Sequence, residues 1–431
     1  MKKIVITILS VLTVSCLLAQ TSIYYSEEYM EKSTTFAATT IGFDVFALSG
    51  GTTQWISDGR LESVNFGPRL SPRLSIGGIH FWGHADFYVA FPLNFLQLGA
   101  EPTELQHLDY KEGIETGARF YPWAVKKGAL RPFVGISFRT RSFSQSGNEY
   151  DLQYDPPRYE KVTYPVQAGF TYTGESFLIS AAVHYQQDRQ FTYFVAPTLP
   201  AEVQADPLSF QVSFVKYWDT DRKMRSKVGI EQQNLKHEVL KKENLLSAWY
   251  VGIGPSASFQ AGENEYFVEN HPYLADETVI ALTPDITFGR YFSKLDANVG
   301  MSYRGFSATV EGFDSRFDMS RRSISLEAYK FLFNYLGFVP YVGLTATAQS
   351  LRVESDFISR SEIKPALGFI FGWDIRVTKT GTNLLRTNLR YNPNLRLDID
   401  GSKANFSYLE FNFIQWVHFF GRKKAYRKYA G

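Results

Sequence analysis

Apolar and polar residues alternate with a period of two along much of the chain. From Leu295 to Tyr303 apolar residues hold every second position, and Asp296 and Ser302 lie on the other face. The same pattern recurs from Leu367 to Arg376 and from Leu385 to Arg396. Because successive side chains of a strand point to opposite faces, this period predicts β-strands with one apolar and one polar face.

The length of these segments indicates the kind of sheet. They run for about 12–16 residues, whereas strands of soluble sheets usually have 5–6, and a tilted strand needs about 9–11 to cross a bilayer. The turns are alternately short, as at Gly83–Ala85, and long, as at Ser146–Glu160. We therefore predict an all-β fold, a transmembrane antiparallel β-barrel of about 16 strands over residues 36–420, with 14 strands as the alternative. A large soluble β-protein is the competing fold class.

The first nineteen residues have the features of a secretory signal peptide. Lys2 and Lys3 precede a short apolar stretch, Ile4–Leu12, and Ala19 supplies the small residue of a cleavage site. We predict export through a cleaved signal peptide (residues 1–19) and then a short periplasmic segment (residues 20–35). A retained N-terminal anchor is the alternative.

Cys16 is the only cysteine, and it lies within the predicted signal peptide. Lipid attachment to Cys16 is an alternative, although Thr13 stands where lipoprotein signals usually carry leucine. Cleavage after Ala19 would leave a chain without cysteine. Disulfides, cysteine-based zinc sites and thiol catalysis would then be excluded.

Composition narrows the classes of protein further. No run of eighteen apolar residues follows the signal peptide, which argues against membrane-spanning helices. Aromatic residues make up 16% of the chain and suit both strands and membrane interfaces. Without Lys2 and Lys3 the 45 basic residues become 43, equal to the 43 acidic residues. This balance gives no indication of nucleic-acid binding.

Two segments depart from the alternation. Residues 219–244 stand where a short turn is expected, yet they are long and charged, which predicts a helix, another inserted element or an extra hairpin. Residues 421–431 form a basic C-terminal tail after Phe420. We expect this tail to be disordered, with a contact to anionic headgroups or to a periplasmic partner as the alternative. Residues 219–244 are a second candidate contact for a periplasmic partner.

Two local sequences carry a resemblance. Gly117–Pro122 and, after a short turn, Arg131–Gly135 look like a hairpin found in many outer-membrane barrels. Leu409, Phe411, Phe413, Val417 and Phe419 are expected on one face of a final strand that ends in aromatic residues. From about Phe36 to Phe420 the chain resembles Gram-negative outer-membrane β-barrel proteins, porin-like families included. The resemblance implies location in the outer membrane, with outer-membrane lipid and the barrel-assembly machinery as partners. The tail beyond Phe420 departs from this pattern.

Charged residues on the polar faces are the candidate functional set. A charge that faces lipid at mid-depth costs about 2–4 kcal/mol for Arg or Lys, so these residues are predicted to line the lumen. There they would form either a network of paired charges that fills a narrow bore or a constriction that selects solutes. The set comprises Glu115, Arg119, Arg139, Arg141, Asp296, Arg304, Glu327, Asp374, Arg376, Arg386, Arg390 and Glu410.

No motif for catalysis stands out. His80 and His84 are four residues apart, but a strand-and-turn setting does not make that spacing a metal pair. Neither a G-x-S-x-G elbow nor a phosphate-binding loop occurs. We predict no enzyme, no cofactor and no metal, although a catalytic set assembled from different strands would escape such a search.

Three functions fit these expectations. The first is passive transport of polar solutes through the lumen. The second is a non-conducting barrel that acts as a scaffold, secretion-system component or surface receptor through its long loops. Transport of hydrophobic compounds or hydrolysis of lipid is the third.

Overall fold

The computed structural model describes residues 37–57, 59–99, 107–146, 156–219, 227–275, 280–334, 337–376 and 380–428. The predicted signal peptide, Cys16 and residues 20–35 lie outside this part of the chain. Within it, the alternating segments form antiparallel strands, as predicted.

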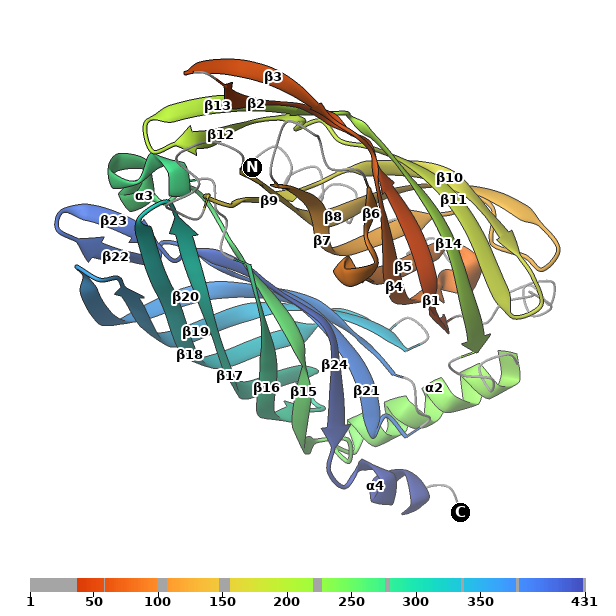
Figure 1. Cartoon of the computed structure of the whole chain (residues 1–431). Coiled ribbons are helices and arrows are strands. Elements are labelled where there is room, and N and C mark those ends of the chain that lie inside the picture. The colour runs from red at the N-terminus through yellow and green to blue at the C-terminus, as the bar shows by residue number, and fades with distance from the viewer. Residues whose placement is uncertain are drawn as a thin grey trace.

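The strands close into two separate rings, one from each half of the chain (Figure 1). The first ring follows the order β1, β14, β11, β10, β8, β7, β5, β4 and closes where β1 pairs with β4. Its strands are β1 (Ala37–Leu48), β4 (Arg69–His80), β5 (Ala85–Pro92), β7 (His107–Phe120), β8 (Leu130–Ser146), β10 (Val166–Thr173), β11 (Phe177–Tyr185) and β14 (Leu208–Asp219).

The second ring runs through consecutive strands and closes where β15 pairs with β24. Its strands are β15 (Ala248–Gln260), β16 (Ile280–Phe292), β17 (Ala297–Gly312), β18 (Ser315–Phe331), β19 (Phe338–Glu354), β20 (Ser359–Ile375), β21 (Asn383–Asn392) and β24 (Tyr408–Phe419).

The prediction of one ring of about 16, or alternatively 14, strands over residues 36–420 is therefore wrong. β14 pairs back onto β1 from Ala38↔Asp219 to Leu48↔Ser209, so the first half closes upon itself. Alternation decides which face of a strand is apolar, but it does not decide which edge strands meet. The same local pattern is compatible with one wide barrel or with two narrow ones.

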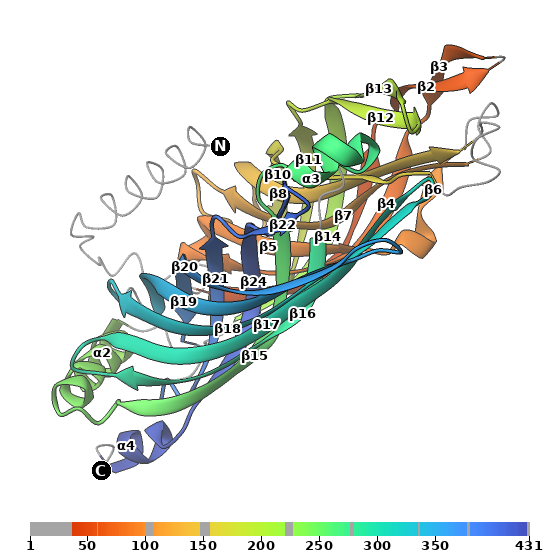
Figure 2. The ribbon, with the colours of Figure 1, turned by 90° about the vertical axis from the view of Figure 1, so that its left-hand side faces the viewer.

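The remaining elements gather at the two ends of the barrels (Figure 2). At one end, here called the loop end, inserted hairpins and short elements extend the strands. At the other, the turn end, the connections within each ring are short. The loop end carries β2 (Gly51–Ser57), β3 (Arg60–Phe66), η3 (Asn94–Leu96), β6 (Leu98–Gly99), β9 (Tyr159–Thr163), β12 (Gln190–Ala196), β13 (Leu199–Ala205), α3 (Glu265–Asn270), η6 (Pro272–Leu274), β22 (Arg396–Ile399) and β23 (Ser402–Asn405). The turn end carries η2 (Phe81–Gly83), α2 (Lys227–Lys242) and α4 (Arg422–Lys428).

Helix α2 resolves the alternatives left open for residues 219–244. It connects the last strand of the first ring to the first strand of the second and lies across the turn end (Figure 1). Helix α4 shows that the expected disorder of the tail is wrong for Arg422–Lys428. This segment folds because Arg422 is buried and gives it an anchor on the barrel. None of the helices in the described residues is long and apolar enough to cross a membrane.

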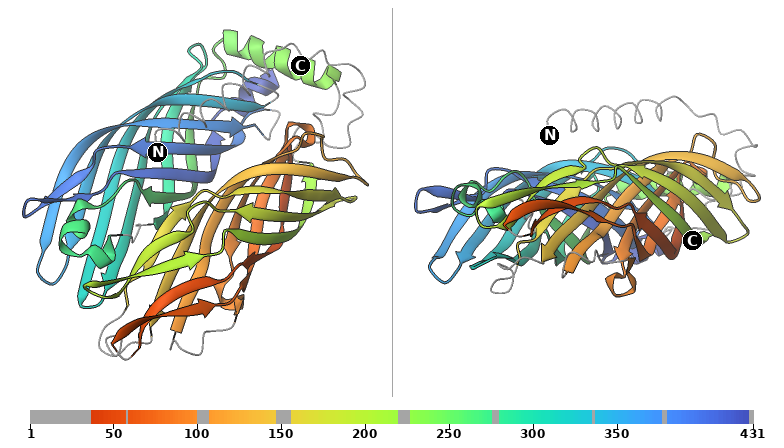
Figure 3. Two further views of the ribbon diagram at one scale, coloured as in Figure 1. Left: turned by 90° about the horizontal axis from the view of Figure 1, so that it is seen from above. Right: turned by 45° about the horizontal axis from the view of Figure 1, so that its top comes forward.

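The two rings lie side by side with their loop ends pointing the same way (Figure 3). Val89 and Phe259 face outward from different rings, yet they are only 8% and 5% exposed because the rings cover each other. The rings of Phe138 and Phe259 meet edge to face with centroids 4.9 Å apart. Closer to the turn end, Phe87 approaches Trp373 at 6.1 Å. An apolar contact therefore joins the barrels.

One bulge changes the predicted face of the final strand. In its pairing with β15, β24 advances four residues, from Asn412 to Trp416, while β15 advances three. The extra residue reverses the alternation. Leu409, Phe411 and Phe413 face outward as expected, but Val417 and Phe419 point inward and are buried. The expectation that all five share one face is wrong for these last two.

Candidate functional site

The interior of each barrel is lined by buried charged side chains. An eight-stranded barrel has an interior just wide enough for side chains to fill, so groups from opposite walls meet. The first ring holds Asp44, Arg69, Arg73, Asp86, Glu112, Glu115, Arg119, Arg139 and Arg141. The second holds four acids and four arginines, namely Asp285, Glu327, Asp374, Glu410, Arg304, Arg321, Arg386 and Arg390.

Glu115 is at the centre of the first network. Arg73 donates from Nη1 to Glu115 at 2.7 Å and from Nε to Asp44 at 2.5 Å. The Tyr88 hydroxyl donates to the other Glu115 oxygen at 2.6 Å. One arginine thus neutralises acids from two different strands, and the phenol satisfies the carboxylate oxygen that remains.

A bulge in β7 adds a second acid to this network. Between Glu112 and Glu115 the strand advances three residues, while its partner β8 advances two, from Arg141 to Arg139. Both glutamates consequently point inward although they are an odd number of residues apart. Arg139 pairs with Glu112 at 2.6 Å and approaches Glu115 at 3.8 Å.

Arg119 links the network to the opposite wall. It donates to Gln211 at 2.9 Å, lies 3.5 Å from Asp86, and stacks over the Tyr88 ring at 4.5 Å from its centroid. Arg141 donates to Gln186 and lies over the Tyr110 ring. Aromatic faces therefore supplement the acids as partners for these cations.

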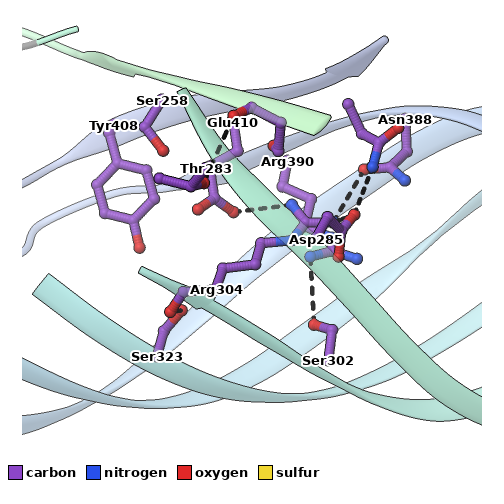
Figure 4. A network of polar contacts seen from close by, with 12 residues as sticks. Ser258, Thr283, Asp285, Ser302, Arg304, Ser323, Asn388, Arg390, Tyr408 and Glu410 are labelled. Carbon is purple, nitrogen blue, oxygen red and sulfur yellow. Dashed lines mark hydrogen bonds and ion pairs between the residues drawn. The ribbon is translucent and has the colours of Figure 1, made fainter. Parts of the chain in front are cut away.

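In the second ring, Arg304 and Arg321 share Glu410. Figure 4 shows Arg304 and Glu410 within this network. Arg304 contacts Glu410 at 3.0 Å and also pairs with Asp285, which accepts a hydrogen bond from Asn412 at 2.6 Å. Arg321 contacts the other Glu410 oxygen at 2.5 Å. These groups come from four strands, so the network crosses the bore.

Two further ion pairs lie in this barrel. Arg386 and Asp374 face each other across β21 and β20 with two hydrogen bonds, at 2.7 and 2.9 Å. The Arg386 guanidinium lies about 5–6 Å from the rings of Tyr250, Tyr329 and Tyr341. Arg390 pairs with Glu327 and donates to the Ser302 hydroxyl at 3.2 Å.

Apolar clusters close the bores at both ends. Phe46, Tyr110 and Phe143 belong to the cluster at the loop end of the first ring, and Tyr121 and Phe133 to the one at its turn end. Corresponding clusters occur in the second ring. A bore filled with water would leave the side chains that line it exposed, whereas Arg73 and Arg139 are 0% exposed.

Two of the predicted lumen residues lie outside these networks. Asp296 is in the turn between β16 and β17, where it accepts hydrogen bonds from Lys241 of α2 at 2.7 Å and from Tyr291 at 2.8 Å. Arg376 follows the last residue of β20 and donates to Nε2 of His237 at 2.9 Å. The strands end before these positions, so the alternation no longer decides where the side chains point.

The contacts of His237 and Arg422 fasten the helices to the turn end. His237 contacts the Tyr426 hydroxyl through Nδ1 at 2.9 Å. Burial, together with the positive charges of Arg376, Arg422 and Lys241, lowers the pKa of His237 to about 2. Arg422 donates to the carbonyl oxygens of Leu246 and Gly381. Burial and the neighbouring Arg376 lower the pKa of Arg422 to about 9, so it remains protonated at neutral pH.

The other ten predicted residues lie inside, in two separate bores: Glu115, Arg119, Arg139 and Arg141 in the first ring, and Arg304, Glu327, Asp374, Arg386, Arg390 and Glu410 in the second. Seven further interior charges were not predicted from the sequence, namely Asp44, Arg69, Arg73, Asp86, Glu112, Asp285 and Arg321. For Arg73 the signal was present, because Leu70, Pro72 and Leu74 alternate with Ser71, Arg73 and Ser75. For Glu112 no such signal was available, because the bulge in β7 interrupts the alternation between Glu112 and Glu115.

The described residues contain no group of three or more His, Cys, Asp or Glu side chains arranged to hold a metal ion. Nor does any catalytic set emerge from the interior contacts given above. In both bores, buried acidic and basic side chains neutralise each other's charge.

Comparison with known proteins gives no family. No family matches the sequence, and no curated protein matches it. Among solved structures, neisserial surface protein A shares 16% identity over 40% of this chain and 99% of its own, with a TM-score of 0.31. OprG from Pseudomonas aeruginosa shares 13% identity over 44% of this chain and 99% of its own, with a TM-score of 0.32. An outer membrane channel from Pseudomonas putida F1 shares 10% identity over 90% of this chain and 98% of its own, with a TM-score of 0.23.

These scores are too low to support an argument, and the fold rests on the strand pairing described above. The strand pattern of the chain resembles that of outer-membrane β-barrel proteins. Two of the three matches, OprG and the channel, are named as outer membrane proteins.

Proposed function

We propose that the chain is a non-conducting outer-membrane protein, not an enzyme, in which two filled barrels anchor a rigid binding surface at the loop end. Of the functions expected from the sequence, this is the second, a scaffold or surface receptor. The observation that carries it is the filling of both bores by paired charges between apolar clusters.

The outward faces support placement in a bilayer. Phe43, Phe170 and Phe214 of the first ring and Phe288 and Phe369 of the second are all more than half exposed. They belong to wide apolar belts around both barrels, far more extensive than the apolar patches that soluble monomers normally expose. The charged networks lie inside the barrels, where they avoid lipid. The loop end would then face outward from the cell and the turn end would face the periplasm.

The interiors argue against diffusion of solutes. Each of the four arginines buried in the second bore has an acidic partner within 3.0 Å. Separating a buried pair leaves uncompensated charge at a cost of about 3–5 kcal/mol. A solute would have to break several such pairs and also displace the apolar clusters. Passive transport would therefore require a large rearrangement.

The loop end is built as a rigid surface. Phe267 of α3 packs against Phe317, with ring centroids 5.2 Å apart, within the apolar cluster that closes the second ring. Arg396 of β22 pairs with Glu265 of α3 at 3.1 Å, and Asn405 of β23 donates to the backbone oxygen of Glu263 at 3.0 Å. A preorganised surface loses little conformational entropy when it binds a partner.

Conductance across planar bilayers tests this function. The purified protein should add no stepwise current above that of empty bilayers, while a general porin reconstituted at the same protein-to-lipid ratio should conduct. Discrete steps that scale with the amount of protein would overturn the proposal and favour passive transport. In that case Arg386→Glu/Arg390→Glu should change the ion selectivity of the current, because these side chains line the second bore.

A further inference from the structure

The exposed cations of the turn end form a basic platform on α2 and α4. We define it as Lys242, Lys423, Lys424, Arg427 and Lys428, all of which are exposed. Helix α4 contains no acidic residue. Among the described side chains of α2 and the turn that follows it, Glu238 and Glu243 are exposed acids. The platform is therefore positive overall.

The platform is held in a fixed place against the second barrel. Leu240 of α2 is fully buried in the apolar cluster at the turn end. His237 joins α2 to Tyr426 of α4 and to Arg376 of the barrel. Arg422 lies over the Phe419 ring at 3.5 Å from its centroid. Both helices are therefore positioned by the barrel, and their free faces point away from it.

Helix α2 also exposes apolar side chains on its free face. Leu235 is 71% exposed and Val239 is 44% exposed. Residues four apart lie on the same side of a helix, so these two form one apolar strip. A helix with such a strip beside basic residues has the character of one that lies in a membrane interface.

Tryptophans show where that interface is. Six of the seven tryptophans lie on the strand ends and turns of the turn end: Trp82, Trp123, Trp218, Trp249, Trp373 and Trp416. Four of them, Trp123, Trp218, Trp249 and Trp416, are exposed on the outside, and exposed tryptophans gather in belts at the level of the lipid headgroups. Trp416 precedes α4 by only a few residues, and Trp249 follows Leu246, whose carbonyl oxygen binds Arg422. The basic platform therefore lies at headgroup level.

We propose that α2 and α4 bind the anionic headgroups of phospholipids in the leaflet at the turn end, with Leu235 and Val239 entering the boundary of the acyl chains. This inference rests on the membrane placement under the proposed function. Phosphate and glycerol-phosphate headgroups match the charge of the platform. The turn end of the second barrel is then fixed to the membrane surface by charge as well as by its apolar belt.

A spin label on α2 tests the proposal. Because Cys16 is the only cysteine, Cys16→Ser/Leu235→Cys carries one reactive thiol. The labelled full chain is placed in nanodiscs of phosphatidylcholine, with or without phosphatidylglycerol, and its accessibility to oxygen and to an aqueous nickel complex is measured. We expect the label to be protected from nickel when phosphatidylglycerol is present. Adding Lys423→Glu/Lys424→Glu/Arg427→Glu should shift the phosphatidylglycerol titration to weaker binding by on the order of a hundredfold.

Two controls separate the outcomes. Arg360→Glu/Lys403→Glu reverses exposed charges at the loop end and should leave the titration unchanged. A label at Leu367, exposed on the outside of β20, reports on the barrel itself. If Leu367 is accessible to nickel, the membrane placement fails. If Leu367 is protected but residue 235 stays aqueous in both lipids, only the headgroup proposal fails. The label at residue 235 could also be protected from nickel regardless of phosphatidylglycerol and of the charges on the platform. That result would overturn the headgroup proposal and favour a protein partner.

Discussion

Arg386 and Asp374 form a two-point ion pair inside the second barrel, with Nε and Nη2 donating to the two carboxylate oxygens at 2.7 and 2.9 Å. The side chains are 2% and 1% exposed. Arg386→Leu would leave Asp374 as a buried carboxylate without a cation. We expect the free energy of unfolding to fall by about 3–5 kcal/mol. Urea titration of folding into lipid vesicles, followed by tryptophan fluorescence, measures it.

A matched pair at the surface provides the control. Arg360 contacts Asp400 at 2.9 Å, but both side chains are more than half exposed. Arg360→Leu should cost at most about 1 kcal/mol. Replacing Arg386 and Asp374 together with leucine should recover much of the loss, because no lone charge remains. If Arg386→Leu and Arg360→Leu lowered the free energy of unfolding equally, the interior of the second barrel would have to be hydrated.

The alternation along the sequence was enough to predict that both residues of this pair point inward. It was not enough to predict the bulges or the way in which the strands close into rings. Asp374 and Arg386 follow the period of two along regular strands, so their inward direction was predictable. Glu112 and Val417 were not, because one extra residue in β7 and one in β24 reverse the faces. Ring closure was also hidden, since the pairing of β1 with β14 joins residues more than 150 positions apart. Alternation carries no information about such distant partners.

The docking of α2 should weaken in acid. Arg376 donates to Nε2 of His237, so that nitrogen has to be unprotonated in the docked helix. The pKa of His237 is lowered by burial and by the charges of Arg376, Arg422 and Lys241. An undocked histidine titrates near its ordinary value of about 6.5. The undocked state therefore binds more protons as the pH falls below about 6.5, and docking loses stability there.

Hydrogen–deuterium exchange of α2 between neutral and mildly acidic pH measures this loss. After correction for intrinsic exchange, protection of α2 should fall by roughly tenfold per pH unit below about 6. In His237→Gln, the amide oxygen can accept from Arg376 and the amide nitrogen can donate to Tyr426 without titrating. This variant should lose the pH dependence. The idea fails if His237→Gln follows the same profile as the wild-type chain.

Gly117 makes room for the ring that supports Glu115. A Cβ added at Gly117 would lie 2.5 Å from the Tyr88 hydroxyl oxygen and 2.6 Å from Cζ. Gly117→Ala would displace this ring and weaken its 2.6 Å hydrogen bond to Glu115. We expect a loss of about 1–3 kcal/mol in the same unfolding assay. At Gly67 nothing lies within 4 Å of an added Cβ, so Gly67→Ala should be close to neutral. Similar losses for both variants would contradict this account of Gly117.

The contact between the barrels can be tested by cross-linking. Phe138 and Phe259 come from different rings and lie edge to face at 4.9 Å. In a Cys16→Ser background, Phe138→Cys/Phe259→Cys should react with a short bifunctional thiol reagent, and mass spectrometry should find the linked peptides. Phe170→Cys/Phe259→Cys is the control, because Phe170 is 55% exposed on the outside of β10. The barrels pack as described only if the first pair links efficiently and the second does not. Barrels that diffuse as independent bodies would link both pairs slowly and to a similar extent, since the connecting segment would let either face collide.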